Sequence, residues 1–255
     1  MSGFPTLRAL ALGLGLIAAG PAFAAGEEVE LPNTRFSFEG LFGHFDRASA
    51  QRGFQVYKEV CASCHSMHLM SYRNLRQIGL SEAEVAAIAA TVQVTDGPND
   101  DGQMIERPGR ASDRFKSPFA NEQAARAANN NAYPPDLSVI TKAREGGADY
   151  IHALLLGYGD PPAGVQVAEG LHYNKYFAGH QIAMPQPLSE GQVEYHDGTK
   201  ATLEQMATDV TQFLTWAAEP EMEERKALGV KMIIFLTILG GLAYAVKRKV
   251  WHDVH

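Results

Sequence analysis

The sequence has few cysteines, no net positive charge and only two long apolar runs. Two of its 255 residues, Cys61 and Cys64, are cysteines, and a protein held together by disulfides would need more. The formal net charge of −7 argues against nucleic acid as a partner of the whole chain. Apolar residues make up 45% of the chain, which excludes a disordered or fibrous protein. A chain of this length can bury a core without covalent cross-links.

The first apolar run lies at the N-terminus. Arg8 precedes eleven apolar residues at 9–19, and Ala-Phe-Ala follows at 22–24. This run is too short to cross a bilayer easily, because a spanning helix needs about 20 apolar residues. A charged residue, a short apolar stretch and an A-x-A site predict a secretory signal peptide over residues 1–24, cleaved after Ala24. A retained N-terminal anchor is the alternative.

The second apolar run, Leu228–Val246, is nineteen residues long and contains one charge, Lys231. As a helix it would be roughly 28 Å long, close to the hydrocarbon thickness of a bilayer. Three basic residues follow at 247–249, as is typical of a cytoplasmic flank. We therefore expect a transmembrane anchor with a short cytoplasmic tail over residues 220–255, with Pro220 in the first turn of its helix. A buried core helix is the alternative.

The charge is divided unevenly along the chain. Residues 25–227 contain 17 Lys and Arg and 28 Asp and Glu, a net charge of −11, whereas the end of the chain is basic. With a cleaved signal peptide and a late anchor, residues 25–219 would form one extracytoplasmic domain. Acidic segments such as 96–101 could steer a basic partner, although such loops usually serve only solubility.

Hydrophobic periodicity and capping patterns predict a mainly α-helical body with long loops. Phe54, Tyr57 and Cys61 share one helix face. Capping boxes begin at Ser81 and Thr202, and Asp136 could cap a further helix. The expected helices cover about residues 48–60, 82–91, 137–144, 149–156 and 203–216, and the expected loops cover 95–118 and 158–200, the latter with little strand.

Residues 61–65 have the sequence Cys-Ala-Ser-Cys-His. Two thiols one helical turn apart can add to the two vinyl groups of a haem, and the following His65 can then ligate the iron. The motif therefore indicates covalent attachment of a c-type haem. A thioredoxin-like site would need a βαβ setting, and a structural zinc site would need further ligands. A disulfide across so short a loop would stabilise the chain little.

The residues alone leave two main candidates for the second axial ligand of the iron. Met184 precedes Pro185, which favours an extended backbone, so that its side chain can project from a loop. His180 is the rival in the same segment. Three other candidates follow His65 too closely to cross easily to the opposite face: Met67, His68 and Met70. Met206 lies on the apolar face of a helix, and Met104 lies in an acidic loop.

Several further segments carry a resemblance to a known family. They are residues 36–40 (FSFEG), 52–57 (RGFQVY), 124–130 (AARAANN), 134–138 (PPDLS), 191–195 with 197–199, and 216–220 (WAAEP). With the haem motif, these segments resemble the cytochrome c1 family, the haem subunit of the cytochrome bc1 complex, from about Phe36 to the end. The chain lacks the extra cysteine pair of some bacterial relatives, and its tail after the anchor is short.

The resemblance implies a class I-like cytochrome c domain, one covalent haem c and a single C-terminal anchor. In the implied site, thioether bonds form at Cys61 and Cys64, and the iron ligands are His65 and Met184. Arg126 would lie beside a haem propionate, and Pro135 would pack against the ring. His/Met ligation raises the potential of a haem. Without the resemblance, Arg126 would be taken as a surface helix residue.

The implied function is the transfer of one electron from a Rieske iron–sulfur subunit to a soluble or tethered cytochrome c. The chain would lie beside cytochrome b in a dimeric complex of a bacterial inner membrane, respiratory or photosynthetic, with the haem domain on the periplasmic side. It would not be an enzyme by itself, since quinol chemistry would belong to other subunits. An independent membrane-anchored cytochrome c is the alternative, and a haem enzyme such as a peroxidase ranks last.

Overall fold

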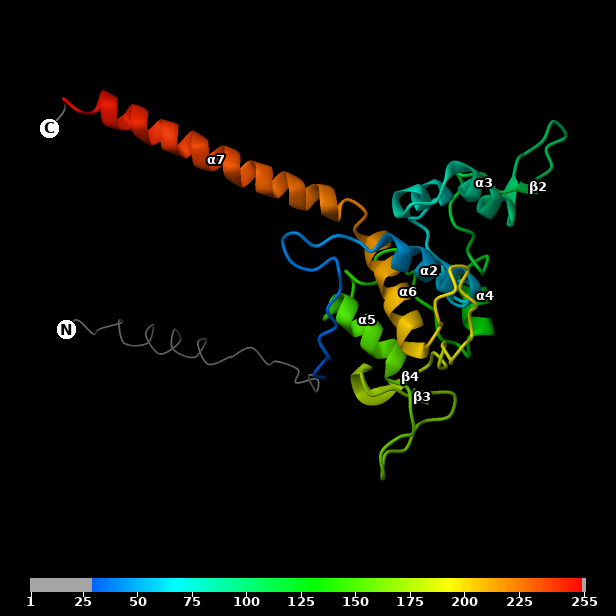
Figure 1. The fold of residues 1–255 in the computed structure, drawn as a ribbon. Coiled ribbons are helices and arrows are strands. Elements are labelled where there is room, and N and C mark those ends of the chain that lie inside the picture. Colours follow the sequence, from blue (N-terminus) through cyan, green and yellow to red (C-terminus); the bar gives the residue numbers. More distant parts are fainter. Residues whose placement is uncertain (1–28, 254–255) are drawn as a thin grey trace, which may run out of the picture.

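The computed structural model describes residues 29–253, so the predicted signal peptide at 1–24 lies outside the described residues. The described chain is mainly helical, with long loops and little strand (Figure 1). The α-helices are α2 (Arg47–Glu59), α3 (Glu82–Ala90), α4 (Glu122–Ala128), α5 (Gly147–Leu156), α6 (Leu203–Ala218) and α7 (Met222–Val250). The short 3₁₀ helices are η1 (Cys61–Ser63), η2 (Tyr72–Ile78) and η3 (Ala178–His180). The strands form two antiparallel pairs, β1 (Gln93–Asp96) with β2 (Ile105–Pro108), and β3 (His172–Tyr173) with β4 (Gln181–Ile182).

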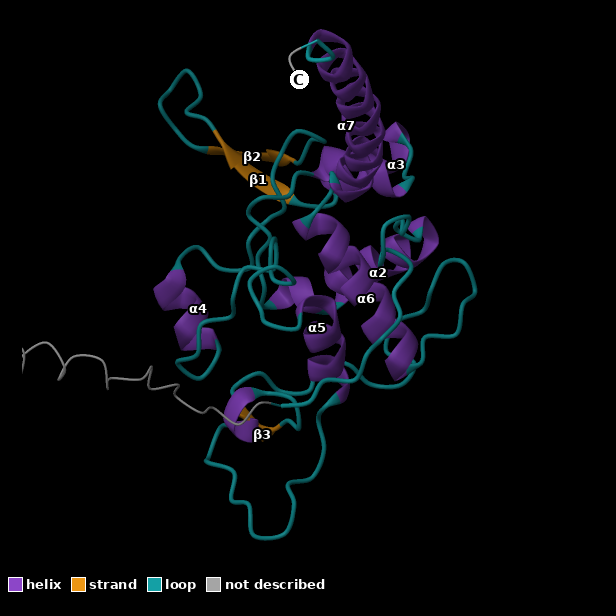
Figure 2. Ribbon diagram, turned by 90° about the vertical axis from the view of Figure 1, so that its left-hand side faces the viewer, coloured by secondary structure: helices purple, strands orange, loops and turns teal. Residues whose placement is uncertain are grey.

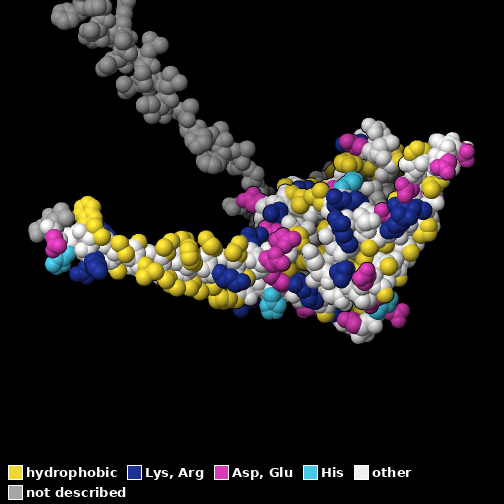
Figure 3. Space-filling model, turned by 90° about the horizontal axis from the view of Figure 1, so that it is seen from above, with side chains coloured by type: hydrophobic (Ala, Val, Ile, Leu, Met, Phe, Trp, Pro, Cys, Tyr) yellow, Lys and Arg dark blue, Asp and Glu magenta, His cyan; other side chains and the backbone are white. Residues whose placement is uncertain are grey.

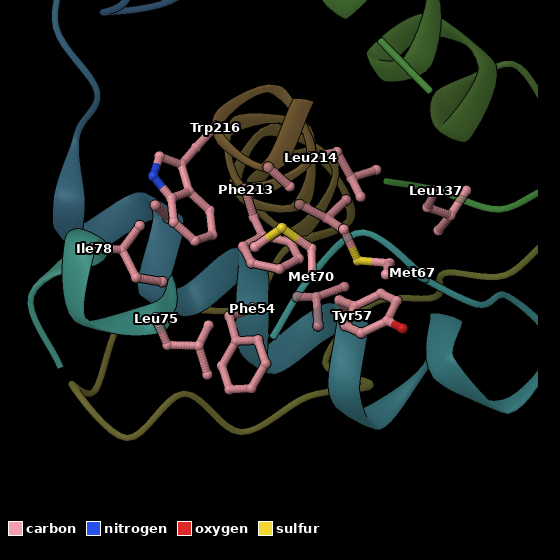
Figure 4. Packing of buried hydrophobic residues seen from close by; sticks show 14 of the residues in the cluster. Phe54, Tyr57, Met67, Met70, Leu75, Ile78, Leu137, Phe213, Leu214 and Trp216 are labelled. Carbon is pink, nitrogen blue, oxygen red and sulfur yellow. The ribbon is translucent and has the colours of Figure 1, made fainter. Parts of the chain in front are cut away.

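Helices α2 and α6 pack directly against each other in the centre of the body. They approach closely at Gly53, where a Cβ atom would collide with the backbone of Asp209 and lie 2.8 Å from the Cβ of Phe213. The rings of Phe54 and Tyr57 lie 5.6 and 5.7 Å from that of Phe213. Figure 4 shows these rings at the centre of the core. A side chain larger than hydrogen at residue 53 would force the helices apart.

A buried carboxylate joins the same two helices. Asp209 of α6 is fully buried and accepts two hydrogen bonds from Arg52 (2.9 and 3.0 Å) and one from the Ser49 hydroxyl (2.6 Å), both on α2. Arg52 also pairs with Asp197 at 2.9 Å. These carboxylates, Asp209 foremost, raise the pKa of Arg52 further above its usual value. A buried charge paired in this way holds one relative position of α2 and α6.

Most of the predicted helices are confirmed. Helices α2, α3, α5 and α6 occupy the expected ranges, and the capping box of α3 is formed by Ser81 and Glu84. Thr202 caps α6 by accepting a hydrogen bond from the backbone of Gln205. Strand content in 158–200 is small, as predicted, since β3 and β4 have two residues each. Helix α4, which was not expected, begins at the N-cap Asn121.

The prediction of a loop throughout 95–118 is wrong, because its first part forms the β1–β2 hairpin. Thr95 pairs with Glu106 across the strands and donates a hydrogen bond to its carboxylate (2.6 Å). Arg107 bonds Asp96 on the opposite strand and Asp113 in the chain that follows, which ties the hairpin to the body. The Gly, Pro, Asp and Asn residues that suggested a loop are concentrated in its tip.

The predicted helix at 137–144 is also wrong, because the chain there forms a series of turns. The Asp136 side chain does accept a hydrogen bond from the backbone N–H of Ser138 (2.9 Å). The same carboxylate also bonds other residues of the chain, and Gly146 and Gly147 follow with positive φ. The Asp136 side chain therefore forms the predicted type of local hydrogen bond, but no helix follows it.

Helix α7 leaves the body as a single long rod (Figure 1), and Figure 2 shows it foreshortened, close to end-on. It is long and apolar enough to cross a membrane, and none of its most apolar stretch is buried. Figure 3 shows its apolar surface, with basic side chains near both ends. Pro220 lies in the turn just before the helix, not in its first turn as expected, and Glu221 is the N-cap. A mainly helical body with one C-terminal apolar helix is thus confirmed.

Candidate haem site

The Cys-x-x-Cys-His segment follows α2 directly and folds into a tight turn. The backbone N–H groups of Cys64 and His65 both donate to the carbonyl of Cys61 (3.1 and 2.9 Å). Both thiols are free, so neither is used in a disulfide. Burial, followed by the neighbouring Cys64, raises the pKa of Cys61 to about 12. A thioredoxin-like site requires a lowered thiol pKa, so this environment disfavours that alternative.

The imidazole of His65 is oriented by a residue seventy positions away. Its Nδ1 lies 2.8 Å from the carbonyl oxygen of Pro135. Because a carbonyl can only accept, Nδ1 carries the hydrogen and Nε2 keeps its lone pair for a metal. Desolvation lowers the pKa of His65, although the bond to Pro135 opposes this shift. A neutral, fixed imidazole with Nε2 available is what ligation of a haem iron requires.

Pro135 therefore serves His65 through its backbone. The resemblance implied that its ring packs against the haem, and the structure adds a role for its carbonyl. This role was not predicted from the sequence, because side-chain patterns do not reveal the direction of a backbone carbonyl. The Pro-Pro pair at 134–135 was the available signal, since two prolines stiffen the segment that presents the acceptor.

Asp136 connects this segment to the chain that follows the haem motif. Its carboxylate accepts hydrogen bonds from the Ser66 hydroxyl (2.9 Å) and from the backbone N–H of His68 (2.7 Å). It also pairs with Nδ1 of His68 at 2.6 Å. Burial opposes ionisation, but the bonds from Ser138, His68 and Ser66 outweigh it and lower the pKa of Asp136. Asp136 thus holds Pro135 and the residues after His65 in a common arrangement.

Met184 lies in the turn after β4 and is half-buried. The Tyr158 hydroxyl donates a hydrogen bond to its backbone carbonyl (3.0 Å). Tyr158 itself forms an isolated β-bridge with Asn174, just beyond the end of α5. The loop that carries Met184 is thereby fastened to α5. The ring of His180, its rival as a ligand, lies 6.0 Å from that of Tyr173 and is also half-buried.

Arg126 lies on α4 and has several partners within its own segment. Its guanidinium bonds the Glu122 carboxylate one turn earlier (2.7 and 2.8 Å) and the carbonyl of Asn131 (3.0 Å). It also lies over the ring of Tyr133, at 5.6 Å. In this arrangement Arg126 ties the turn after α4 back to the helix. Contact with a haem propionate stays a prediction.

Most of the chain is similar to proteins of one known family. Residues 36–254 match the model of the cytochrome c1 family. The chain belongs to the cytochrome c1 family. It is 52% identical to "Cytochrome c1-1, heme protein, mitochondrial" of Solanum tuberosum, over 97% of this chain and 79% of that one. It is 46% identical to "Cytochrome c1" of Rhodospirillum rubrum, over 97% of both chains.

A further relative, from Candida albicans, is named "Cytochrome b-c1 complex catalytic subunit, mitochondrial" and is 50% identical over 91% of this chain and 81% of its own length. The resemblance inferred from short segments is therefore confirmed along most of the chain. The relatives' identity extends well beyond the Cys-x-x-Cys-His motif, which on its own occurs in many proteins with attached haem.

Two of the other methionines considered as ligands, Met206 and Met104, lie where they were predicted. Met206 is fully buried in the core on α6, whereas Met104 is 63% exposed. Met67 and Met70 are buried, and Figure 4 shows them within the core cluster close to Tyr57 and Phe54. Among residues 29–253 there is no group of three or more His, Cys, Asp or Glu side chains that could hold a metal ion.

Proposed function

We propose that this chain is the electron-transfer subunit of a cytochrome bc1 complex, with one covalently bound haem c. It would accept one electron from a Rieske iron–sulfur subunit and pass it to a cytochrome c. The observation that carries the proposal is the hydrogen bond between His65 Nδ1 and the Pro135 carbonyl beside two free cysteine thiols. It prepares an iron ligand next to two sites of attachment, in a chain of the cytochrome c1 family.

Each site residue has a defined task in this proposal. Cys61 and Cys64 would hold the haem by thioether bonds, each thiol adding its S–H across one vinyl group, and Nε2 of His65 would be one ligand of the iron. Met184 would be the second ligand, and its thioether would favour the reduced iron and so raise the haem potential. The bound haem would supply reversible exchange of one electron. With both ligands supplied by the protein, the site favours electron transfer over catalysis on a small molecule.

The protein around the site lets the electron pass with little rearrangement. The bond to Pro135 prevents rotation of the His65 ring, and Asp136 bonds Ser66 and His68 in the segment that follows it. Tyr158 holds the backbone of Met184. Side chains held in this way would need to move little when the iron gains or loses an electron, which would keep the reorganisation cost low. We retain Arg126 as a residue beside a propionate, a role in which it would exchange Glu122 for the haem carboxylate.

The proposal also places the chain in a cell. Residues 1–24 are a signal peptide, residues 25–219 are the haem domain on the periplasmic side, and residues 220–255 anchor it in a bacterial inner membrane. The apolar surface of α7 and the basic residues at 247–249 support this orientation. The partners would be cytochrome b and a Rieske subunit in a dimeric complex. The name of the Candida relative supports membership of a cytochrome b-c1 complex.

Purification from membranes tests the proposal. We expect a c-type spectrum, a haem-stained band on a denaturing gel, and copurification with a cytochrome b and a Rieske protein. A haem-stained band that purifies without either partner would favour an independent membrane-anchored cytochrome c. No haem stain after denaturation would refute the covalent attachment through Cys61 and Cys64.

Substitution of the second ligand tests the site itself. Met184→Leu should abolish the methionine-to-iron charge-transfer band of the ferric protein and lower the haem potential, while the haem remains attached. The matched control is Met104→Leu, because Met104 is exposed and should leave the band intact. If the band persists in Met184→Leu, a methionine other than Met184 is the ligand. If the unaltered protein already lacks the band, His180 becomes the candidate to test next.

A further inference from the structure

The first turns of α7 hold a loop from the opposite end of the chain. We refer to residues 37–44, between two buried phenylalanines, as the 37–44 loop. Lys226 Nζ donates to the carbonyls of Phe38 (2.6 Å) and Gly43 (3.3 Å). The carboxylate of Glu223 accepts a hydrogen bond from the backbone N–H of Phe45 (2.7 Å). These hydrogen bonds therefore fix the position of the loop along the axis of α7.

The 37–44 loop is also closed within itself. The backbone N–H of His44 donates to the carbonyl of Ser37 (3.0 Å), and Gly40 turns the chain at φ +69°. Beneath the loop, the buried rings of Phe38 and Phe45 lie 5.5 Å apart. These contacts fix the base of the loop to the body and leave only its tip projecting.

The tip presents two apolar side chains to the outside. Leu41 is 57% exposed, and Phe42 is 81% exposed, more than any other large apolar side chain in the described part of the chain. In Figure 1 the loop, in blue, extends past the first turn of α7 in the direction that α7 takes. An exposed Leu-Phe pair on a well-fastened loop requires a partner to cover it.

The position of the loop along α7 identifies the kind of partner. Lys226 lies two residues before Leu228, where the apolar run begins. At about 1.5 Å of rise per residue, the carbonyls that it bonds are within roughly one helical turn of the start of the hydrocarbon. A tip of two apolar residues is much smaller than a stable protein–protein interface, which buries about 1,200 Å² or more. Apolar tips flanked by polar groups are typical of segments that lie in a lipid interface.

We propose that the 37–44 loop is a second membrane contact, with Leu41 and Phe42 inserted at the boundary between lipid headgroups and acyl chains beside α7. The inference rests on the proposed crossing of the membrane by α7. Two contacts at different points restrict the tilt of the body on its single-helix anchor. The loop thereby holds the haem domain at a defined orientation to the membrane surface.

Spin labelling of the full chain, in its complex and reconstituted in phospholipid nanodiscs, tests this contact. The labels are placed on three single variants, Phe42→Cys, Met104→Cys and Leu236→Cys. Cys61 and Cys64 would be consumed by the haem, so the introduced thiol is the only free cysteine of this chain. The complex with the unaltered chain, treated with the same label, gives the background from other subunits. Met104 is an exposed residue far from α7 in the sequence, and Leu236 lies in the middle of α7. Collision of each label with oxygen, which concentrates in lipid, is compared with collision with a water-soluble nickel chelate.

We expect the oxygen-to-nickel collision ratio at residue 42 to be several-fold higher than at 104 and lower than at 236. A ratio at 42 equal to that at 104 would place the loop in water and overturn the inference. Low collision with both reagents at 42 would show that another protein covers the tip, which also overturns it. Nickel access at 236 would show instead that α7 does not cross the membrane, so the proposed anchor would fail and the loop contact with it.

Discussion

The two proposed iron ligands lie in regions of very different construction. His65 follows α2, which packs on α6 around a fully buried carboxylate, and its ring is hydrogen-bonded to Pro135. Met184 lies in residues 158–200, a segment of loops, one short 3₁₀ helix and two-residue strands. The difference teaches that one ligand is positioned by the core itself, whereas the other depends on a few bonds from a loop to its surroundings.

The most severe way to test the difference is to disturb the contact of α2 with α6. Gly53→Ala introduces a Cβ that collides with the backbone of Asp209, so the helices must separate. We expect a loss of about 3 kcal/mol or more in the free energy of unfolding, with reduced haem incorporation. Thermal unfolding followed by circular dichroism, with the haem content of purified protein, measures both.

The matched control is Gly159→Ala in the Met184 region. Nothing lies within 4 Å of a Cβ at Gly159, and its φ is outside the left-handed region. We expect its stability to change by less than about 0.5 kcal/mol. Equal effects at residues 53 and 159 would contradict the contrast between the two regions.

Asp136→Asn weakens the connection between Pro135 and the residues after His65. It removes the charge that Ser66 and His68 bond, so we expect a loss of about 1–3 kcal/mol in stability. Loss of a negative charge near the iron should also raise the haem potential. Potentiometric titration distinguishes the two roles, since a purely structural residue would leave the potential unchanged. Asp160→Asn, an exposed residue of the Met184 region, should change neither quantity.

Tyr158→Phe removes the hydrogen bond to the backbone of Met184 and little else. We expect a loss of about 1 kcal/mol, and a methionine-to-iron band that disappears at a lower temperature than in the unaltered protein. The exposed Tyr133 offers a comparison, because Tyr133→Phe should leave the band unchanged. If Tyr158→Phe has no effect on the band, the loop is held by other contacts.

The smallest effect is expected outside both regions, at the tip of the β1–β2 hairpin. Asp96 is paired with Arg107, whereas Asp100 and Asp101 are exposed. If this tip steers a basic cytochrome c, Asp100→Asn with Asp101→Asn should slow its reduction modestly at low ionic strength only. Stopped-flow rates across a salt series provide the measurement. A salt dependence equal to that of the unaltered protein would show that the tip serves solubility alone.

Much of the fold followed from patterns that lie close together in the chain. The capping box at Ser81 and the apolar face of α2 depend on residues one turn apart, and both were predicted correctly. The β1–β2 hairpin was missed because its pairing joins residues nine to fifteen positions apart, across a tip that resembles a loop. The helix after Asp136 was wrong because its cap is also a partner of the distant Ser66 and His68.

The sequence by itself determined the haem motif, the long apolar helix and the family to which they belong, because spacing, length and composition are local properties. Only the tertiary structure decided which carbonyl orients His65, how Asp136 joins two distant segments, and which loop α7 holds beside its first turn. These contacts join residues from 68 to 188 positions apart. Every residue has the same backbone carbonyl, so the sequence does not show which donor each carbonyl meets in the folded chain.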